Sequence, residues 1–133
     1  MNHLPPISIR VIAHSNQKYD TAGDYCEMYD NWYMKISKMK DWRYEALVTV
    51  HELIEMILTK HHGVDWNDID IFDMAGEGKD HPDPGTLPSA PYHNEHMLAT
   101  QIEKKLAKML NVDWKEYDES FNDLKWGTQN ADS

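Results

Sequence analysis

The chain has a single cysteine, few basic residues and no long hydrophobic run, and each shortage excludes a class of protein. Cys26 alone forms neither an intramolecular disulfide nor a cysteine-based zinc site. No stretch approaches the roughly 18–20 apolar residues of a membrane span. The first ten residues lack the basic and apolar segments of a signal peptide, so we predict a cytoplasmic protein.

Positive charge is scarce as well. Lys and Arg number 13 against 23 Asp and Glu, which gives a net charge of −10. Such a surface repels phosphate backbones, so we expect no nucleic acid as a partner. The 133 residues, 41% of them hydrophobic, suit one folded domain of ordinary size. We expect that domain to span residues 1–126, with a flexible tail over 127–133.

Local patterns predict an α+β fold. Alternating or β-branched segments indicate three short strands at residues 7–13, 24–29 and 32–37. Helical patterns follow at residues 42–60, 66–74, 92–110 and 113–124. Asp41 is placed to cap the first helix, and Gly63 to end it after His61 and His62. We expect an antiparallel sheet of two or three strands, packed on two long helices and a short C-terminal one.

Residues 75–91 contain three glycines and four prolines without periodicity, which predicts a long loop. Acidic residues are dense here and just before. Seven of them lie between positions 65 and 83, namely Asp65, Asp68, Asp70, Asp73, Glu77, Asp80 and Asp83. Their spacing does not fit the alternating ligands of a calcium-binding EF-hand loop. We therefore expect a solvated acidic surface rather than a calcium site.

The first long helix carries the strongest indication of chemistry. Its apolar run ALVTVHELIEMIL is interrupted by His51, Glu52 and Glu55, which fall within an arc of about 100° on a helix. His51 and Glu55 are one turn apart and converge on one point, with Glu52 beside them. This resembles the H-E-x-x-H metallohydrolase helix, in which the intervening Glu activates water. The alternative is an amphipathic helix that has these groups on its polar edge.

The second long helix adds further candidate ligands. Glu95 projects near the centre of its expected apolar face, and His96 lies at the margin of that face. The apolar face consists of Leu98, Ala99, Ile102, Leu106, Met109 and Leu110. A buried carboxylate needs a cation or strong donors, although a helix N-terminus would also favour Glu95. We predict that His51 and Glu55, with Glu95, His96 or both, bind a divalent metal, Zn²⁺ first and Mn²⁺ or Fe²⁺ as alternatives.

The order of these segments resembles a minimal zincin core, as in the compact metallopeptidase-like domains of phages and mobile elements. The stretches YDTAGDY, DWRYEALVTVHELIE and PYHNEHMLATQIE are also similar to small uncharacterised phage-encoded proteins. That likeness covers most of residues 7–115 and implies no known activity. The zincin likeness implies a metal-dependent hydrolase with Glu52 as general base, acting on a peptide, amide or ester. Glu55 stands where zincins have their second histidine.

Two other functions compete with this hypothesis. All-helical nucleotide pyrophosphohydrolases bind Mg²⁺ through carboxylates on facing helices, and Glu52, Glu55 and Glu95 could serve. The strand patterns argue against that fold, and the four residues from Glu95 (EHML) lack a second carboxylate pair. A net charge of −10 also suits an acidic phage accessory protein that mimics DNA and blocks a host protein in the host cytoplasm.

Overall fold

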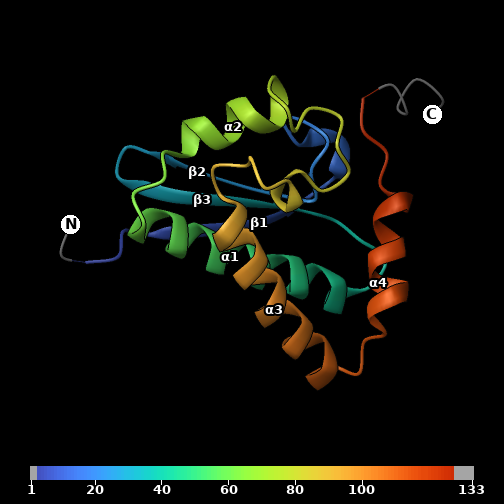
Figure 1. Cartoon of the computed structure of the whole chain (residues 1–133). Helices are drawn as coiled ribbons and strands as arrows, with labels where there is room; N and C mark the ends of the chain where they lie inside the picture. Colours follow the sequence, from blue (N-terminus) through green and yellow to red (C-terminus); the bar gives the residue numbers. More distant parts are fainter. Residues whose placement is uncertain (1–2, 128–133) are drawn as a thin grey trace.

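Within residues 3–127, which the computed structural model describes, three strands precede four helices (Figure 1). The strands are β1 (Ile7–Ile12), β2 (Gly23–Met28) and β3 (Asn31–Ser37). The helices are α1 (Trp42–His61), α2 (Trp66–Met74), α3 (His93–Met109) and α4 (Trp114–Ser120). This is the predicted α+β fold. The predicted tail lies outside the described residues except for Gly127.

The sheet is mixed, whereas the sequence predicts an antiparallel one. β2 and β3 form an antiparallel hairpin through Tyr29 and Asp30, whose positive φ angles of 51° and 60° suit a two-residue turn. β3 lies between β2 and β1 and runs parallel to β1. The prediction was wrong because alternation within a strand indicates its two faces but not its neighbour. The ten residues 13–22 are long enough to pass β3, since two strand spacings are only about 10 Å.

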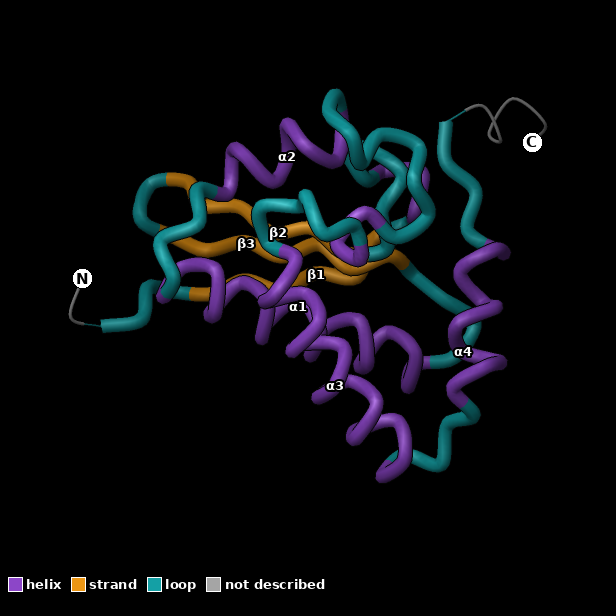
Figure 2. Tube along the Cα trace, in the orientation of Figure 1, coloured by secondary structure: helices purple, strands orange, loops and turns teal. Residues whose placement is uncertain are grey.

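One face of the sheet is covered by helices. Trp32, Met34 and Ile36 alternate along β3 and are buried on this face. Trp66, at the start of α2, packs edge-on against the rings of Tyr25 and Trp32. α1 covers β2 and β3 on the same side, as the tube in Figure 2 shows. α1 and the start of α2 therefore cover the same face of the sheet.

α1 is the central element, and its ends follow the expected signals. The Asp41 carboxylate accepts a hydrogen bond from the backbone N–H of Arg43, and Gly63 takes a left-handed φ of 75° just past the C-terminal end. α3 packs along α1 in the opposite direction (Figure 1), since Arg43 reaches the carbonyl of Leu110 at one end and His62 reaches Glu95 at the other.

The face of α3 that packs on α1 differs from the predicted one. α3 buries Glu95, His96, Ala99, Glu103 and Ala107. By contrast, apolar residues of the predicted core face are exposed, namely Leu98 at 44%, Ile102 at 40% and Met109 at 77%. The reason is that α1 presents His51 and Glu55 to α3, and buried polar groups require polar partners. Polar pairing thus decides the rotation of α3.

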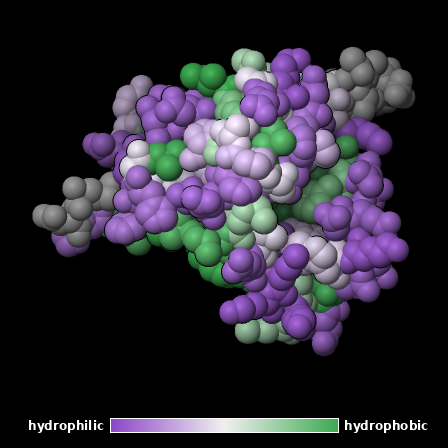
Figure 3. All heavy atoms as spheres, in the orientation of Figure 1, coloured by the Kyte–Doolittle hydropathy of each residue, from purple (hydrophilic) through white to green (hydrophobic). Residues whose placement is uncertain are grey.

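The last predicted helix is shorter than expected. α4 ends at Ser120, and a single 3₁₀ turn, η3 (Phe121–Asp123), replaces its continuation. Tyr117 of α4 is fully buried and reaches toward the α1–α3 interface. Figure 3 shows a largely hydrophilic face, with hydrophobic residues gathered below α1 in that view. Among residues 3–127, no helix combines the length and apolar character needed to cross a membrane.

Candidate metal centre

Three side chains from α1 and α3 converge at the helix interface. Glu55 Oε2 lies 3.1 Å from His51 Nε2 and 2.9 Å from His96 Nδ1, and the two ring nitrogens are 3.1 Å apart. All three residues are buried. His51 and Glu55 are one helical turn apart on α1, and His96 enters from the first turn of α3. The structure thus brings together three of the predicted ligands in one cluster, hereafter the His/Glu cluster.

The His/Glu cluster fits a divalent cation. Two imidazole nitrogens and one carboxylate oxygen suit Zn²⁺, Fe²⁺ or Mn²⁺. Ligands about 2.0–2.1 Å from a tetrahedral metal lie roughly 3.3 Å apart. The observed separations of 2.9–3.1 Å therefore need to widen by only a few tenths of an ångström. Three protein ligands leave coordination positions open for water and substrate, as in catalytic zinc sites.

A chain of buried groups orients His51. Its Nδ1 lies 2.8 Å from Glu103 Oε1, and the other oxygen of Glu103 accepts a short hydrogen bond from the Tyr117 hydroxyl. All three residues are buried. A carboxylate on the outer nitrogen of a ligating histidine fixes the ring and makes the inner nitrogen a better ligand. The contact with Glu103 thus leaves Nε2 of His51 facing the cluster.

A different carboxylate orients His96. Its Nε2 lies 3.0 Å from Asp83 Oδ1, which leaves Nδ1 facing the cluster. Asp83 belongs to the loop between α2 and α3, and its side chain is 57% exposed. Gly85, two residues later, packs so closely on the imidazole that a Cβ there would collide with the ring. The two histidines therefore present opposite ring nitrogens, and a carboxylate lies beside the outer nitrogen of each.

The charges of the cluster support one another. Burial alone would raise the pKa of Glu55, but hydrogen bonds with the two imidazoles lower it to about 2. Burial is also the largest influence on both histidines and lowers their pKa values. Their carboxylate partners outweigh it, raising the pKa of His51 well above its usual range and that of His96 to about 9. Since a metal binds unprotonated imidazole, metal binding would release protons.

Glu52 lies beside the cluster rather than in it. One of its carboxylate oxygens is 4.0 Å from His51 Nε2, and its side chain is 12% exposed. Gly23 of β2 makes room for it, because a Cβ at that position would lie 2.5 Å from Glu52 Cγ. Burial, followed by the negative charge of Glu55, raises the pKa of Glu52 well above its usual range. The carboxyl group is thus placed to exchange a proton next to the ligands.

Glu95, predicted as a ligand, is buried but lies elsewhere. Its Oε2 is 2.6 Å from Nδ1 of His62, the residue that ends α1, and this pair ties the two helices together. Consecutive residues on a helix point about 100° apart, so Glu95 and His96 do not both face His51. Of the alternatives that the sequence left open, the structure brings His96 to His51 and Glu55, whereas Glu95 pairs with His62. His62 stands at the helix end, as the sequence predicts.

The sequence analysis did not identify several residues that contact the cluster or support it. Glu103 follows His96 by seven residues, the spacing of one helix face, and this repeat could have identified it. Tyr25 donates a hydrogen bond of 2.9 Å to Glu55 Oε1 from β2. Tyr117 and Asp83 come from distant segments of the chain, and no local pattern links them to a histidine. Their roles depend on packing.

The acidic stretch is not uniformly solvated, contrary to prediction. Asp73 is buried and accepts hydrogen bonds from the hydroxyl groups of Tyr92, at 2.8 Å, and Tyr19, at 2.9 Å. Burial raises its pKa to about 6 although the phenols lower it. Asp83 contacts His96. At least these two acids therefore have specific partners, and Asp83 and the other five are partly or fully exposed.

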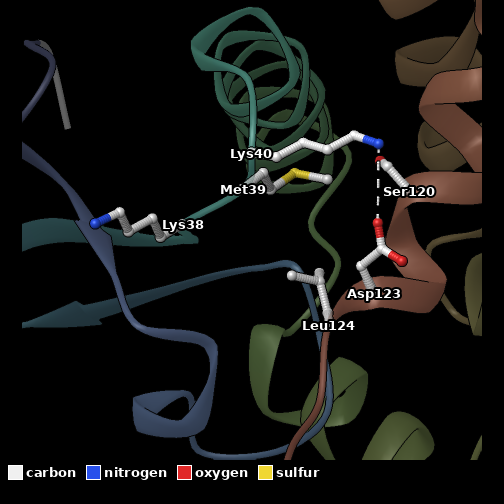
Figure 4. Close-up of a pocket in the computed structure, with 6 residues that line it drawn as sticks. All are labelled: Lys38, Met39, Lys40, Ser120, Asp123 and Leu124. Carbon is white, nitrogen blue, oxygen red and sulfur yellow. Dashed lines mark ion pairs between the residues drawn. The ribbon is translucent and has the colours of Figure 1, made fainter.

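The two most distinct cavities among residues 3–127 lie outside the His/Glu cluster. One, of about 150 Å³, is formed by the segment between β3 and α1 and by the end of α4. In Figure 4, Lys40 points across it toward Asp123, at a distance of 4.0 Å. The other, of about 330 Å³, lies between β2 and α2 and is lined by Tyr25 and Trp66. Of the residues that line these two cavities, Tyr25 contacts the cluster through its hydrogen bond to Glu55.

Comparisons with known proteins add no support for the proposed metal site. No protein-family model, no curated protein and no solved structure matches this chain. The likeness to zincins and to phage-encoded proteins therefore stays a prediction. What the structure establishes is a buried cluster of His51, Glu55 and His96 that could hold a metal ion.

Proposed function

We propose that this protein is a metal-dependent hydrolase of zincin type, with Zn²⁺ bound by His51, Glu55 and His96. The observation that carries the proposal is the convergence of three buried ligand atoms, each 2.9–3.1 Å from the others, from two antiparallel helices. An ordinary helix interface would fill this position with apolar side chains. The carboxylates behind both histidines add the supporting groups typical of metal centres.

Each residue has a definite task in such a site. A bound divalent cation would act as a Lewis acid and make water a nucleophile near neutral pH. Glu52, beside the ligands, would accept a proton from the attacking water and return it to the leaving group. Burial and the nearby charge of Glu55 raise its pKa, which makes its carboxylate a stronger base than an exposed one. Peptides, amides and esters all suit this chemistry.

Glu55 in place of a second histidine changes the charge of the site. With a dication, its carboxylate leaves a net charge of +1 among the three ligands. Two histidines and one carboxylate also form the usual ligand set of nonheme Fe²⁺ sites, so Fe²⁺ and Mn²⁺ are the alternatives to Zn²⁺. Elemental analysis distinguishes these metals directly.

A second candidate is a metal-binding protein without catalysis. The burial of the cluster supports it. Neither cavity described above includes one of the three ligands. Such a protein could serve as an acidic phage accessory protein that binds a host partner, in keeping with its charge of −10. The all-helical pyrophosphohydrolase alternative does not fit, because the fold contains a three-stranded sheet.

The test is elemental analysis of the untagged protein as purified and after incubation with Zn²⁺, Mn²⁺ or Fe²⁺. We expect about one equivalent of metal in the wild type and its loss in His51→Ala and Glu55→Ala. His61→Ala is the matched control, because His61 is an exposed histidine of the same helix. Wild-type protein that holds no metal and takes up none tightly would contradict the proposal. The cluster would then be a structural hydrogen-bond network.

Glu52→Gln separates the two candidates. The substitution leaves the three ligands in place, so metal content should stay at the wild-type level. Hydrolysis of a peptide or ester substrate found by screening should fall by about 10²–10⁴-fold, the usual contribution of a general base. Unchanged hydrolysis would remove Glu52 from the mechanism. Metal binding without any hydrolysis in the wild type would favour the non-catalytic role.

A further inference from the structure

The two carboxylates that orient the histidines differ in their surroundings. Glu103 is buried on α3 and is held by Tyr117. Asp83 lies on the loop between α2 and α3, with more than half of its side chain exposed, although it contacts a buried histidine. Such an exposed acid is usually a solvated surface group. Its contact with the outer nitrogen of His96 gives it a specific place at the cluster.

The contact bears on which ring nitrogen of His96 carries the proton. Neutral imidazole has one donor and one acceptor nitrogen, and only the unprotonated nitrogen binds a metal. Asp83 Oδ1 lies 3.0 Å from Nε2, where its negative charge favours a proton on that nitrogen, and Nδ1 is then the unprotonated nitrogen 2.9 Å from Glu55. Without this acceptor, nothing described on the outer side of the ring favours that tautomer.

The backbone after Asp83 holds the ring in the same orientation. Gly85, in the 3₁₀ turn η2 (Pro84–Thr86), packs flat on the imidazole of His96 with no room for a side chain. The ring N–H of His93, one position inside α3, points to the Gly85 carbonyl at 3.0 Å. Residues 83–85 therefore sit on the first turn of α3 and cover the outer side of His96.

We propose that Asp83 is a positioning residue that holds His96 with Nδ1 toward His51 and Glu55, so that the metal centre is complete only while residues 83–85 rest on α3. The inference builds on the proposed metal site and goes beyond it. It assigns a function to an exposed acid of the acidic stretch. It also makes the loop between α2 and α3 part of the centre, although it supplies no ligand.

The experiment measures Zn²⁺ affinity of the full chain by competition with a chromophoric chelator at fixed pH. Asp83→Ala removes the acceptor, whereas Asp83→Asn keeps an oxygen that can accept from Nε2–H. Glu77→Ala, at an exposed acid of the same loop, controls for the loss of one negative charge. The tautomer and the ligating nitrogen of His96 are read in the Zn²⁺-loaded protein from long-range ¹H–¹⁵N correlation spectra. Circular dichroism confirms that each variant is folded.

We expect Asp83→Ala to bind Zn²⁺ about 10–100-fold more weakly, the usual effect of losing such a partner. Asp83→Asn should stay within a few-fold of the wild type and keep Nδ1 ligation, and Glu77→Ala should bind like the wild type. Asp83→Ala with wild-type affinity and unchanged ligation would overturn the inference and leave the proposed function standing. Asp83→Asn as weak as Asp83→Ala would assign the effect to charge and also overturn it. A wild type that binds no metal would overturn both proposals.

Discussion

The two histidines of the His/Glu cluster are held by contrasting regions of the molecule. His51 lies in the middle of α1, and its supporting residues Glu103 and Tyr117 are buried. His96 is supported by Asp83, an exposed residue of an irregular loop. The difference teaches that one half of the cluster is built into the helix core and the other half depends on a surface segment. Perturbing the first should cost stability, whereas perturbing the second should change the cluster with little cost to the fold.

The largest effect is expected at Glu103. Glu103→Ala leaves His51 and the Tyr117 hydroxyl without their shared partner in a buried site, and we expect a loss of about 3–5 kcal/mol in the free energy of unfolding. Urea denaturation of the metal-free protein measures it. Asp83→Ala, at the exposed carboxylate, should lose less than about 1 kcal/mol. Similar losses in the two variants would contradict the contrast between core and surface.

A smaller effect is expected from pH. The pKa of His96 is raised to about 9 in the fold, against about 6.5 when unfolded, so its imidazolium stabilises the metal-free fold. This stabilisation is complete below about pH 6.5 and is lost as the pH rises through about 9, at most about 3 kcal/mol. Urea denaturation at several pH values measures it.

The Asp83→Asn variant connects the pH effect to the loop. The substitution removes one of the two carboxylates that raise the pKa of His96. The alkaline loss of stability should therefore be smaller and should begin at lower pH than in the wild type. A stability curve that is flat between pH 6.5 and 9 in the wild type would contradict the assignment of a charged His96.

Tyr117→Phe tests the hydrogen bond from the Tyr117 hydroxyl to Glu103, the carboxylate behind His51. The substitution keeps the ring among its aromatic neighbours Tyr44, Trp114 and Phe121 and removes one hydrogen bond to Glu103. We expect a loss of about 1–2 kcal/mol in the free energy of unfolding, with His51 still oriented by Glu103. An unchanged stability would show that the Tyr117 hydroxyl does not support the cluster.

A small change in stability is expected from Gly85→Ala. The added Cβ would collide with the His96 ring, but the surface loop can shift to relieve it, so we expect a loss of about 1 kcal/mol. The loss in the free energy of Zn²⁺ binding should be larger than the loss in the free energy of unfolding, since the shift moves Asp83. Ser89→Ala, at an exposed position of the same loop, is the control. Wild-type Zn²⁺ affinity in Gly85→Ala would show that the position of this turn is unimportant.

Local sequence patterns predicted the elements well. The helix at 66–74 was predicted at its observed bounds, and the three strands and α1 within one or two residues. Capping groups and alternation act over a few residues, so they can be seen in the sequence. The strand order and the parallel pairing of β1 with β3 depend on contacts between distant segments, and the prediction of an antiparallel sheet failed there.

The prediction of the cluster was likewise correct for local geometry and incomplete for contacts between helices. His51 and Glu55 are one turn apart on one helix, so their convergence follows from helix geometry. The choice between Glu95 and His96 depended on the rotation of α3, which helix periodicity placed incorrectly. The apolar residues of α3 indicated the wrong buried face, because Glu103 and His96 were needed to pair with polar groups of α1.

The sequence by itself determined an acidic α+β chain with one histidine and two glutamates on one side of a helix, because these properties depend on composition and on local periodicity. Only the tertiary structure decided which partners those residues meet. Asp83 and Tyr117 are 13 residues before His96 and 14 after Glu103, on segments whose positions depend on the packing of the whole chain. Long-range pairing of buried polar groups therefore shaped the centre, since such groups are costly without partners and local patterns do not specify where the partners lie.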